Sequence, residues 1–183
     1  MKMINKVIFV MAGLLMLSAC GTNSGGNQDP STLNVMILSE IPLNYQSSFN
    51  PYVEELISDV NNEDLDVNVS LFLVSHDKLA IEIVAREVDV FVLDESLKHI
   101  IMDPYGLHPL DELIDILPET PPYEEYIMRD EETGSHHLYA VPLDNDSTFV
   151  RDLGVELPSN LIAVVVKTSP HKEIGVHLIE KLL

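Results

Sequence analysis

The sequence predicts an α/β fold, a single three-layer lobe in which a mostly parallel sheet lies between two layers of helices. Short runs rich in Val, Ile and Leu alternate along the chain with segments whose apolar residues recur at helical spacing. This strand–helix order implies parallel strands joined by right-handed crossovers. Apolar residues make up 46% of the 183 residues, which is enough for a real core, and no internal repeat is visible. Residues 33–183 are therefore expected to form one domain.

Three strand–helix units are predicted in the first half of this domain. Pro51 is expected near the start of the first helix, where its missing N–H costs little. Ser75 is expected to cap the second helix with its hydroxyl group. The predicted strands are residues 33–38, 65–74 and 88–93, and the predicted helices are residues 49–60, 75–87 and 97–102.

The second half of the domain is less regular. Residues 118–135 hold three Pro, six acidic residues and one Gly, a composition typical of a long surface loop. Residues 152–160 are ambiguous. The last helix should have Ser169 as its cap and Pro170 in its first position. The remaining predictions are one or two helical turns over residues 110–117, strands over 137–143 and 161–167, and a final helix over 169–183.

The first twenty residues have the features of an export signal. Lys2 and Lys6 precede an apolar run over residues 7–17, which is too short to span a bilayer. The run ends in Leu-Ser-Ala-Cys-Gly at positions 17–21, which resembles the bacterial lipoprotein lipobox. The resemblance implies a signal peptide over residues 1–19 and a diacylglycerol on the Cys20 sulfur. The alternative is an ordinary secretory peptide with an incidental cysteine.

Residues 20–32 are expected to form the lipidated cysteine and a flexible tether, because residues 21–32 are rich in Gly, Asn and Ser and lack hydrophobic side chains. Two acyl chains give stable anchoring, so the folded part should sit at the cell membrane on the extracytoplasmic face. Both a Gram-positive surface and a periplasmic leaflet agree with the motif.

The charge of the chain excludes some classes of partner. The sequence carries 30 acidic and 10 basic residues, a net charge of −20, and loss of Lys2 and Lys6 with the signal peptide makes it −22. No basic patch offsets these carboxylates, so nucleic-acid binding is excluded. Cys20 is the single cysteine, which excludes an intramolecular disulfide and any Cys-rich zinc module.

Several segments resemble the extracellular solute-binding lipoproteins of ABC importers. They are residues 79–91, which lead into a strand with an Asp-Val pair, the Pro-Leu-Asp turn in 107–113, the Tyr-Ala-Val-Pro strand in 138–142, and 161–167 followed by Ser-Pro-His-Lys-Glu. The resemblance implies a periplasmic-binding-protein-like lobe. Arg86 stands where the family usually has Gly, and only about twenty residues separate Val141 from Leu161, where the family has its second lobe. The chain is therefore expected to be reduced to one lobe.

Five residues are candidate ligand contacts. Ser39 and Glu40 follow the first predicted strand, and Asp94 and Glu95 follow the third. These positions fall at the carboxyl edge of a parallel sheet, where α/β folds place ligands. Tyr139, near the segment that crosses to the second lobe in the resembled family, is expected at the same edge. The alternative for each residue is a cap or loop position.

No metal site or cofactor is predicted. His136 and His137 are adjacent, so in a strand they point to opposite faces. Residues 144–148 begin like a calcium loop, but Phe149 stands where the required Gly belongs. The acidic stretch over residues 112–132 could bind a cation or a basic partner, or could simply be solvated.

The sequence favours a binding protein over an enzyme. It contains no Gly-x-Ser-x-Gly elbow, no His-Glu-x-x-His helix and no Gly-rich phosphate loop. The first hypothesis is a one-lobed lipoprotein associated with carbohydrate or polysaccharide uptake or degradation, pectin-type glycans being one guess among several. The second is an accessory lipoprotein that docks to an ABC permease or an extracellular polysaccharide-degrading enzyme and binds no small molecule. The third is a decayed remnant of a full binding protein.

Overall fold

The central feature of the molecule is a five-stranded sheet in the order β2-β1-β3-β7-β6. The computed structural model describes residues 30–61, 65–117 and 122–183. Strands β1, β2 and β3 are parallel, β7 is antiparallel to β3, and β6 is antiparallel to β7. The mostly parallel sheet is thus confirmed. The strands are β1 (Thr32–Leu38), β2 (Asp66–Phe72), β3 (Val90–Asp94), β6 (Val141–Leu143) and β7 (Leu161–Val165).

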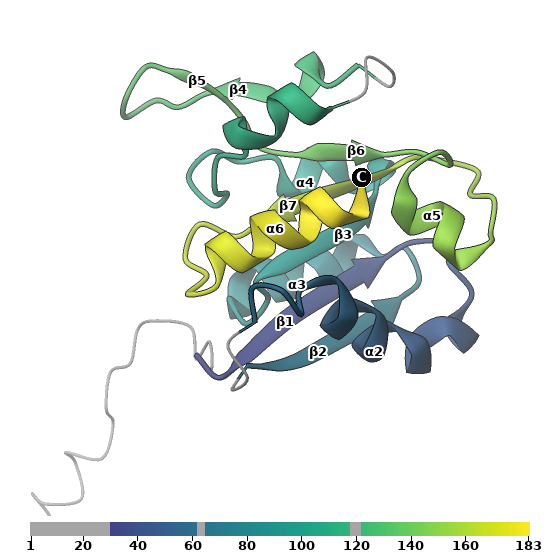
Figure 1. The fold of residues 1–183 in the computed structure, drawn as a ribbon. Helices are drawn as coiled ribbons and strands as arrows, with labels where there is room; N and C mark the ends of the chain where they lie inside the picture. The colour runs from purple at the N-terminus through teal and green to yellow at the C-terminus, as the bar shows by residue number, and fades with distance from the viewer. Residues whose placement is uncertain (1–29, 62–64, 118–121) are drawn as a thin grey trace, which may run out of the picture.

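Helices cover both faces of this sheet, which confirms the three-layer α/β lobe (Figure 1). One face carries α2 and α6, with α5 beside them, and the other carries α3 and α4. Short 3-10 helices and a separate two-stranded sheet complete the fold. These elements are α2 (Gln46–Leu56), α3 (His76–Ala85), α4 (Lys98–Ile101), α5 (Thr148–Leu153), α6 (Lys172–Leu182), η2 (Leu43–Tyr45), η3 (Glu95–Leu97), η4 (Asp111–Ile116), η5 (Glu124–Tyr126), β4 (Ile127–Arg129) and β5 (His136–Leu138).

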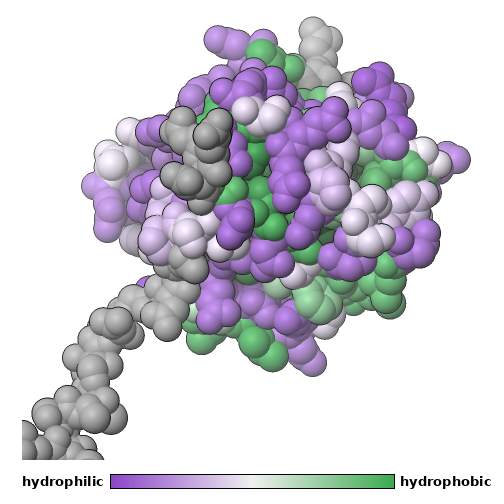
Figure 2. Space-filling view, turned by 60° about the horizontal axis from the view of Figure 1, so that its bottom comes forward, coloured by the Kyte–Doolittle hydropathy of each residue, from purple (hydrophilic) through white to green (hydrophobic). Residues whose placement is uncertain are grey.

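One apolar core joins the sheet to its helices. Every residue of β3, β6 and β7 is buried, and the buried hydrophobic side chains run from Leu33 to Leu182. The signal peptide, Cys20 and most of the expected tether lie outside the described residues, and β1 begins at Thr32. A chain that starts at Cys20 therefore keeps the whole core. The face in Figure 2 is largely hydrophilic, with hydrophobic side chains in smaller groups.

Two helices begin elsewhere than predicted. Helix α2 starts at Gln46 rather than at residue 49, so Pro51 lies inside it. Helix α6 starts at Lys172, and Ser169 does not cap it. The Ser169 hydroxyl instead donates to Asp89 Oδ1 at 2.6 Å and accepts the His171 N–H at 2.9 Å. By contrast, Ser75 caps α3 as predicted.

The predicted loop over residues 118–135 is wrong for residues 124–129 and correct for the turn over 130–135, while residues 118–121 lie outside the described residues. Residues 124–129 form η5 and β4, and β4 pairs antiparallel with β5. The turn between them is held by the Asp130 carboxylate, which accepts the N–H groups of Glu132 and Thr133, and by Gly134 at φ 75°. The predicted strand over residues 137–143 is accordingly divided between two sheets.

Side chains of α2 cover the outer edge of β2. The Gln46 amide donates to the Val69 carbonyl at 2.7 Å and accepts the Leu71 N–H at 2.6 Å. The Asn50 amide donates to the Val67 carbonyl at 3.1 Å and accepts the Val69 N–H at 2.9 Å. The two amides stand one helical turn apart and bond the strand as a neighbouring strand would. They occupy an edge that could otherwise pair with another chain.

Replacing both Gln46 and Asn50 with alanine is expected to lower the free energy of unfolding by about 2 kcal/mol, since four hydrogen bonds are lost while water reaches part of the edge. The exposed edge should also promote concentration-dependent association. Denaturant titration and light scattering measure the two effects. Ser47→Ala, an exposed position on the same helix, is the control, and a monomeric double variant with an unchanged midpoint would contradict the prediction.

Candidate functional site

The candidate residues at the ends of β1 and β3 lie at the same edge of the sheet, with Asp94 as the last residue of β3 itself. Leu38 pairs with Leu93 in the parallel register of the two strands. Ser39 and Asp94 each come one residue later, so they lie at the same carboxyl edge. Glu40 and Glu95 follow them directly. The structure therefore assembles these side chains from two parts of the chain more than fifty residues apart.

Ser39 is used by the turn that leaves β1. The residue is fully buried, and its hydroxyl accepts the Ile41 N–H at 3.2 Å. Its own N–H donates to the Phe72 carbonyl at 3.1 Å, which extends the β1–β2 pairing by one residue. Glu40 next to it is exposed. Of these two residues, Glu40 is the one that offers its side chain to solvent.

Asp94 holds together the segments around the end of β3. Its carboxylate accepts the N–H and hydroxyl of Ser96, at 3.0 and 2.5 Å, and the hydroxyl of Ser159. Burial raises the pKa of this carboxyl group, but the hydrogen bonds from Ser159 and Ser96 outweigh it and hold the pKa below its usual value. The side chain is only 5% exposed. Asp94 thus acts as the cap of η3 and ties it to the segment before β7.

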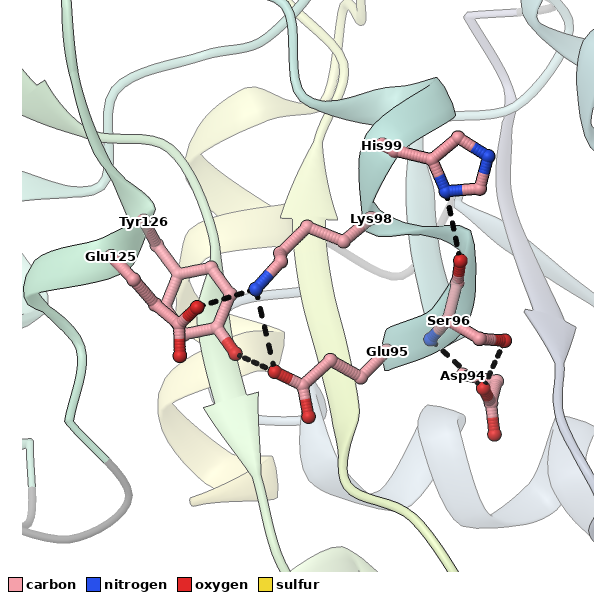
Figure 3. Close-up of polar contacts among 7 residues, drawn as sticks. All are labelled: Asp94, Glu95, Ser96, Lys98, His99, Glu125 and Tyr126. Atoms are coloured by element: carbon pink, nitrogen blue, oxygen red, sulfur yellow. Dashed lines mark hydrogen bonds and ion pairs between the residues drawn. The ribbon is translucent and has the colours of Figure 1, made fainter.

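Glu95 belongs to a network that joins η3 and α4 to η5 (Figure 3). The Tyr126 hydroxyl donates to Glu95 Oε1 at 2.7 Å. Lys98 Nζ lies between two carboxylates, 2.5 Å from Glu125 Oε2 and 3.6 Å from Glu95 Oε1. The same ammonium group is 5.1 Å from the centre of the Tyr126 ring, a cation–π distance.

Two members of this network of Glu95, Lys98, Glu125 and Tyr126 have a raised pKa, namely Lys98 and Tyr126. The hydrogen bond to Glu125 and the nearby carboxylates raise the pKa of Lys98. Burial first, and then the bond to Glu95, raise the pKa of the Tyr126 hydroxyl well above its usual value. Neither group is prepared to act as a base near neutral pH. The arrangement clamps the β4–β5 sheet, through η5, onto the lobe.

Tyr139 lies behind this clamp. Its side chain is fully buried, and its N–H donates to the Tyr126 carbonyl at 3.1 Å. Its ring meets the His137 ring edge-on, with 6.2 Å between centroids. Burial and the charges of Asp130 and Asp111 raise the pKa of the Tyr139 hydroxyl. Val141 is level with Val92 and Leu143 with Asp94, so Tyr139, two residues before β6, lies toward the amino ends of the parallel strands. The expectation that Tyr139 shares the carboxyl edge is therefore wrong, because β6 enters the sheet from the opposite end.

Sequence reasoning missed Lys98 and Tyr126, which complete the network around Glu95. A usable signal was the spacing of Glu95 and Lys98, because residues three apart on a helix are neighbours. The contact between Glu95 and Tyr126 spans 31 residues, and no local pattern indicates it.

Of the residues considered as metal ligands, His137 and Asp144 have other partners. His137 Nδ1 lies 2.5 Å from Asp111 Oδ2, whereas Asp144 accepts the N–H of Asp146 in the turn before α5. Among the residues that the structure describes, no three His, Cys, Asp or Glu side chains are arranged to hold a metal ion. In that same part of the chain, no helix is both long and apolar enough to cross a membrane.

The fold and the site together define a one-lobed α/β protein. At the carboxyl edge of its sheet, the Ser39 and Asp94 side chains form hydrogen bonds within the protein. The chain is similar to a protein of Bacillus subtilis (strain 168) named "Putative lipoprotein YteS", with 24% identity over 182 residues that cover 99% of this chain and 96% of that protein. No family model matches the chain, and no solved structure matches it.

Proposed function

We propose that the chain is a lipoprotein anchored to the extracytoplasmic face of the cell membrane through a diacylglycerol on Cys20. The Leu-Ser-Ala-Cys-Gly motif at positions 17–21 supports the attachment. The Bacillus relative carries "lipoprotein" in its name, and its similarity spans 99% of this chain, so the match includes the signal segment.

Replacing Cys20 with alanine is expected to move the protein from the membrane fraction to the soluble fraction, because the acyl chains supply the anchoring. Fractionation of cells followed by a carbonate wash measures this change. Asn23→Ala, in the expected tether, is the control and should leave the protein with the membranes. Retention of the Cys20→Ala protein by washed membranes would remove the basis of the proposal.

In this proposal the lipoprotein serves the uptake or degradation of a carbohydrate or polysaccharide, such as a pectin-type glycan, and is not itself an enzyme. The segments that resemble ABC-importer binding proteins support this setting. Two modes of action were open: weak sugar capture at the carboxyl edge, or docking to an ABC permease or an extracellular polysaccharide-degrading enzyme. The geometry favours docking, because the Ser39 and Asp94 side chains make internal hydrogen bonds.

A photo-crosslinking residue at position 40 tests the docking mode. Glu40 is exposed beyond the carboxyl end of β1, while Glu87, exposed before the amino end of β3, is a matched control at the opposite edge. We expect position 40, and not position 87, to crosslink in membranes to a permease or a secreted polysaccharide-degrading enzyme, identified by mass spectrometry.

A thermal-shift screen of the chain from residue 20, with Cys20→Ser, against mono- and oligosaccharides decides between the two modes. A sugar at 100 times its Kd would stabilise the protein by about 2.7 kcal/mol and raise the midpoint by about 5–10 °C. Docking predicts no such shift. A sugar that produces it, with no crosslink from position 40, would favour capture instead.

A further inference from the structure

A hollow of about 260 Å³ lies on the α3–α4 face of the sheet, away from the carboxyl edge. Its walls come from α3, α4, β3 and the residues that follow β7, and most are apolar. The volume is just below the range of ~300–1,000 Å³ typical of small-molecule sites. Apolar side chains on its walls include Ile83, Phe91, Ile100 and Val166. Charged residues that also line the hollow include Arg86 and Asp103.

Arg86 stands in this hollow at a backbone position that favours glycine. It ends α3 in the left-handed conformation, at φ 56° and ψ 40°, and is the one non-glycine residue of the described chain with positive φ. Helix α5 ends in the same conformation on Gly154. The helix end itself needs only the backbone bond from the Arg86 N–H to the Glu82 carbonyl, at 3.0 Å, which glycine would also make. The backbone conformation therefore gives no reason for an arginine at this position.

The Arg86 guanidinium makes no hydrogen bond or ion pair with any residue that the structure describes, although acidic residues outnumber basic ones three to one. The two carboxylates that line the same hollow have partners other than Arg86, Glu82 an ion pair and Asp103 a backbone hydrogen bond. Glu82 pairs with Lys78 at 2.6 Å, and Asp103 Oδ1 accepts the Tyr105 N–H at 3.0 Å. Arg86, an exposed residue at the rim of this apolar hollow, is left without a carboxylate partner among the described residues.

We propose that this hollow binds a small carboxylic acid with an apolar body. The ligand carboxylate pairs with the Arg86 guanidinium, whose planar fork matches a carboxylate with two parallel hydrogen bonds. The apolar body packs against Phe91, Ile100 and Val166. This site is separate from the carboxyl edge and goes beyond the docking function, so either can fail without the other.

NMR titration of the chain from residue 20, with Cys20→Ser, tests the proposal. The probes are octanoate for an aliphatic body and phenylacetate for an aromatic one, each with its neutral amide. We expect at least one acid to bind with a Kd below ~1 mM, to shift the amide signals of Arg86 and Phe91, and to bind at least tenfold more tightly than its amide. The acid that binds more tightly then shows whether the hollow prefers an aliphatic or an aromatic ligand.

Three variants separate the role of Arg86 from an effect on folding. Arg86→Gln should weaken acid binding at least tenfold and leave amide binding unchanged. Arg86→Gly should lose acid binding equally while raising the thermal midpoint, because glycine relieves the left-handed backbone. Arg151→Gln, at an exposed arginine on α5, should bind like the parent chain. Equal binding of acid and amide, full binding by Arg86→Gln, or no saturable shift with any probe up to ~10 mM would overturn the proposal.

Discussion

Replacement of Asp89 with alanine is expected to lower the free energy of unfolding by about 3–5 kcal/mol, since both oxygens of a buried carboxylate lose hydrogen bonds and their donors are left without a partner. Asp89 is 1% exposed. Its carboxylate accepts the Asn34 N–H at 2.8 Å and the Ser169 hydroxyl at 2.6 Å. Its backbone also bonds Asn34 and Val166. Asp89 therefore links β1, β3, the end of β7 and the approach to α6.

Thermal and denaturant unfolding measure this prediction, and a loss of this size should lower the thermal midpoint by about 10 °C. Asp89→Asn keeps one acceptor oxygen and should lose less stability than alanine. Asp66→Ala, an exposed aspartate at the start of β2, serves as the control and should change stability by less than about 0.5 kcal/mol. A loss below 1 kcal/mol for Asp89→Ala would contradict the assigned role.

Gly175→Val is expected to destabilise the protein by about 3 kcal/mol through overpacking. Gly175 lies in α6 where the helix crosses the sheet. A Cβ atom there would come within 2.9 Å of a Val90 methyl group and 3.2 Å of a Val165 methyl group. Both valines are in the buried sheet, so neither can move aside freely. Valine adds two further methyl groups to this contact.

The alanine variant at the same position separates packing from helix propensity. Gly175→Ala gains about 1 kcal/mol in intrinsic helix stability, which offsets part of the clash, so its loss should be clearly smaller than that of valine. Glu180→Val, at an exposed position on the same helix, controls for the β-branched side chain. Equal stability of Gly175→Val and the parent chain would show that α6 can shift away from the sheet.

Elements with a strong local signal were predicted well, and those that depend on distant partners were not. Strand β3 and the Ser75 cap of α3 follow from neighbouring residues. The start of α2 does not, because Gln46 bonds β2 at residues 69 and 71. The β4–β5 sheet was missed for a similar reason, since a three-residue strand becomes ordered only against its partner.

The candidate site shows the same division. The sequence placed Ser39, Glu40, Asp94 and Glu95 at one edge, because a parallel sheet brings the carboxyl ends of its strands together. The hydrogen-bond partners of these side chains could not be predicted from their positions in the sequence. The bonds from Ser159 to Asp94 and from Tyr126 to Glu95 cross 65 and 31 residues.

By itself, the sequence determined the α/β class, the position of the core segments and the likeness of residues 17–21 to a lipobox. Each of these is a local or periodic property of the chain, and periodicity decides which faces are buried. Only the tertiary structure decided that Asp94 and Asp89 are internal partners, that Lys98 and Tyr126 close the edge around Glu95, and that Arg86 stands beside a hollow without an anion. These facts depend on which side chains meet across the fold, and an unpaired charge is recognised only when all its neighbours are known.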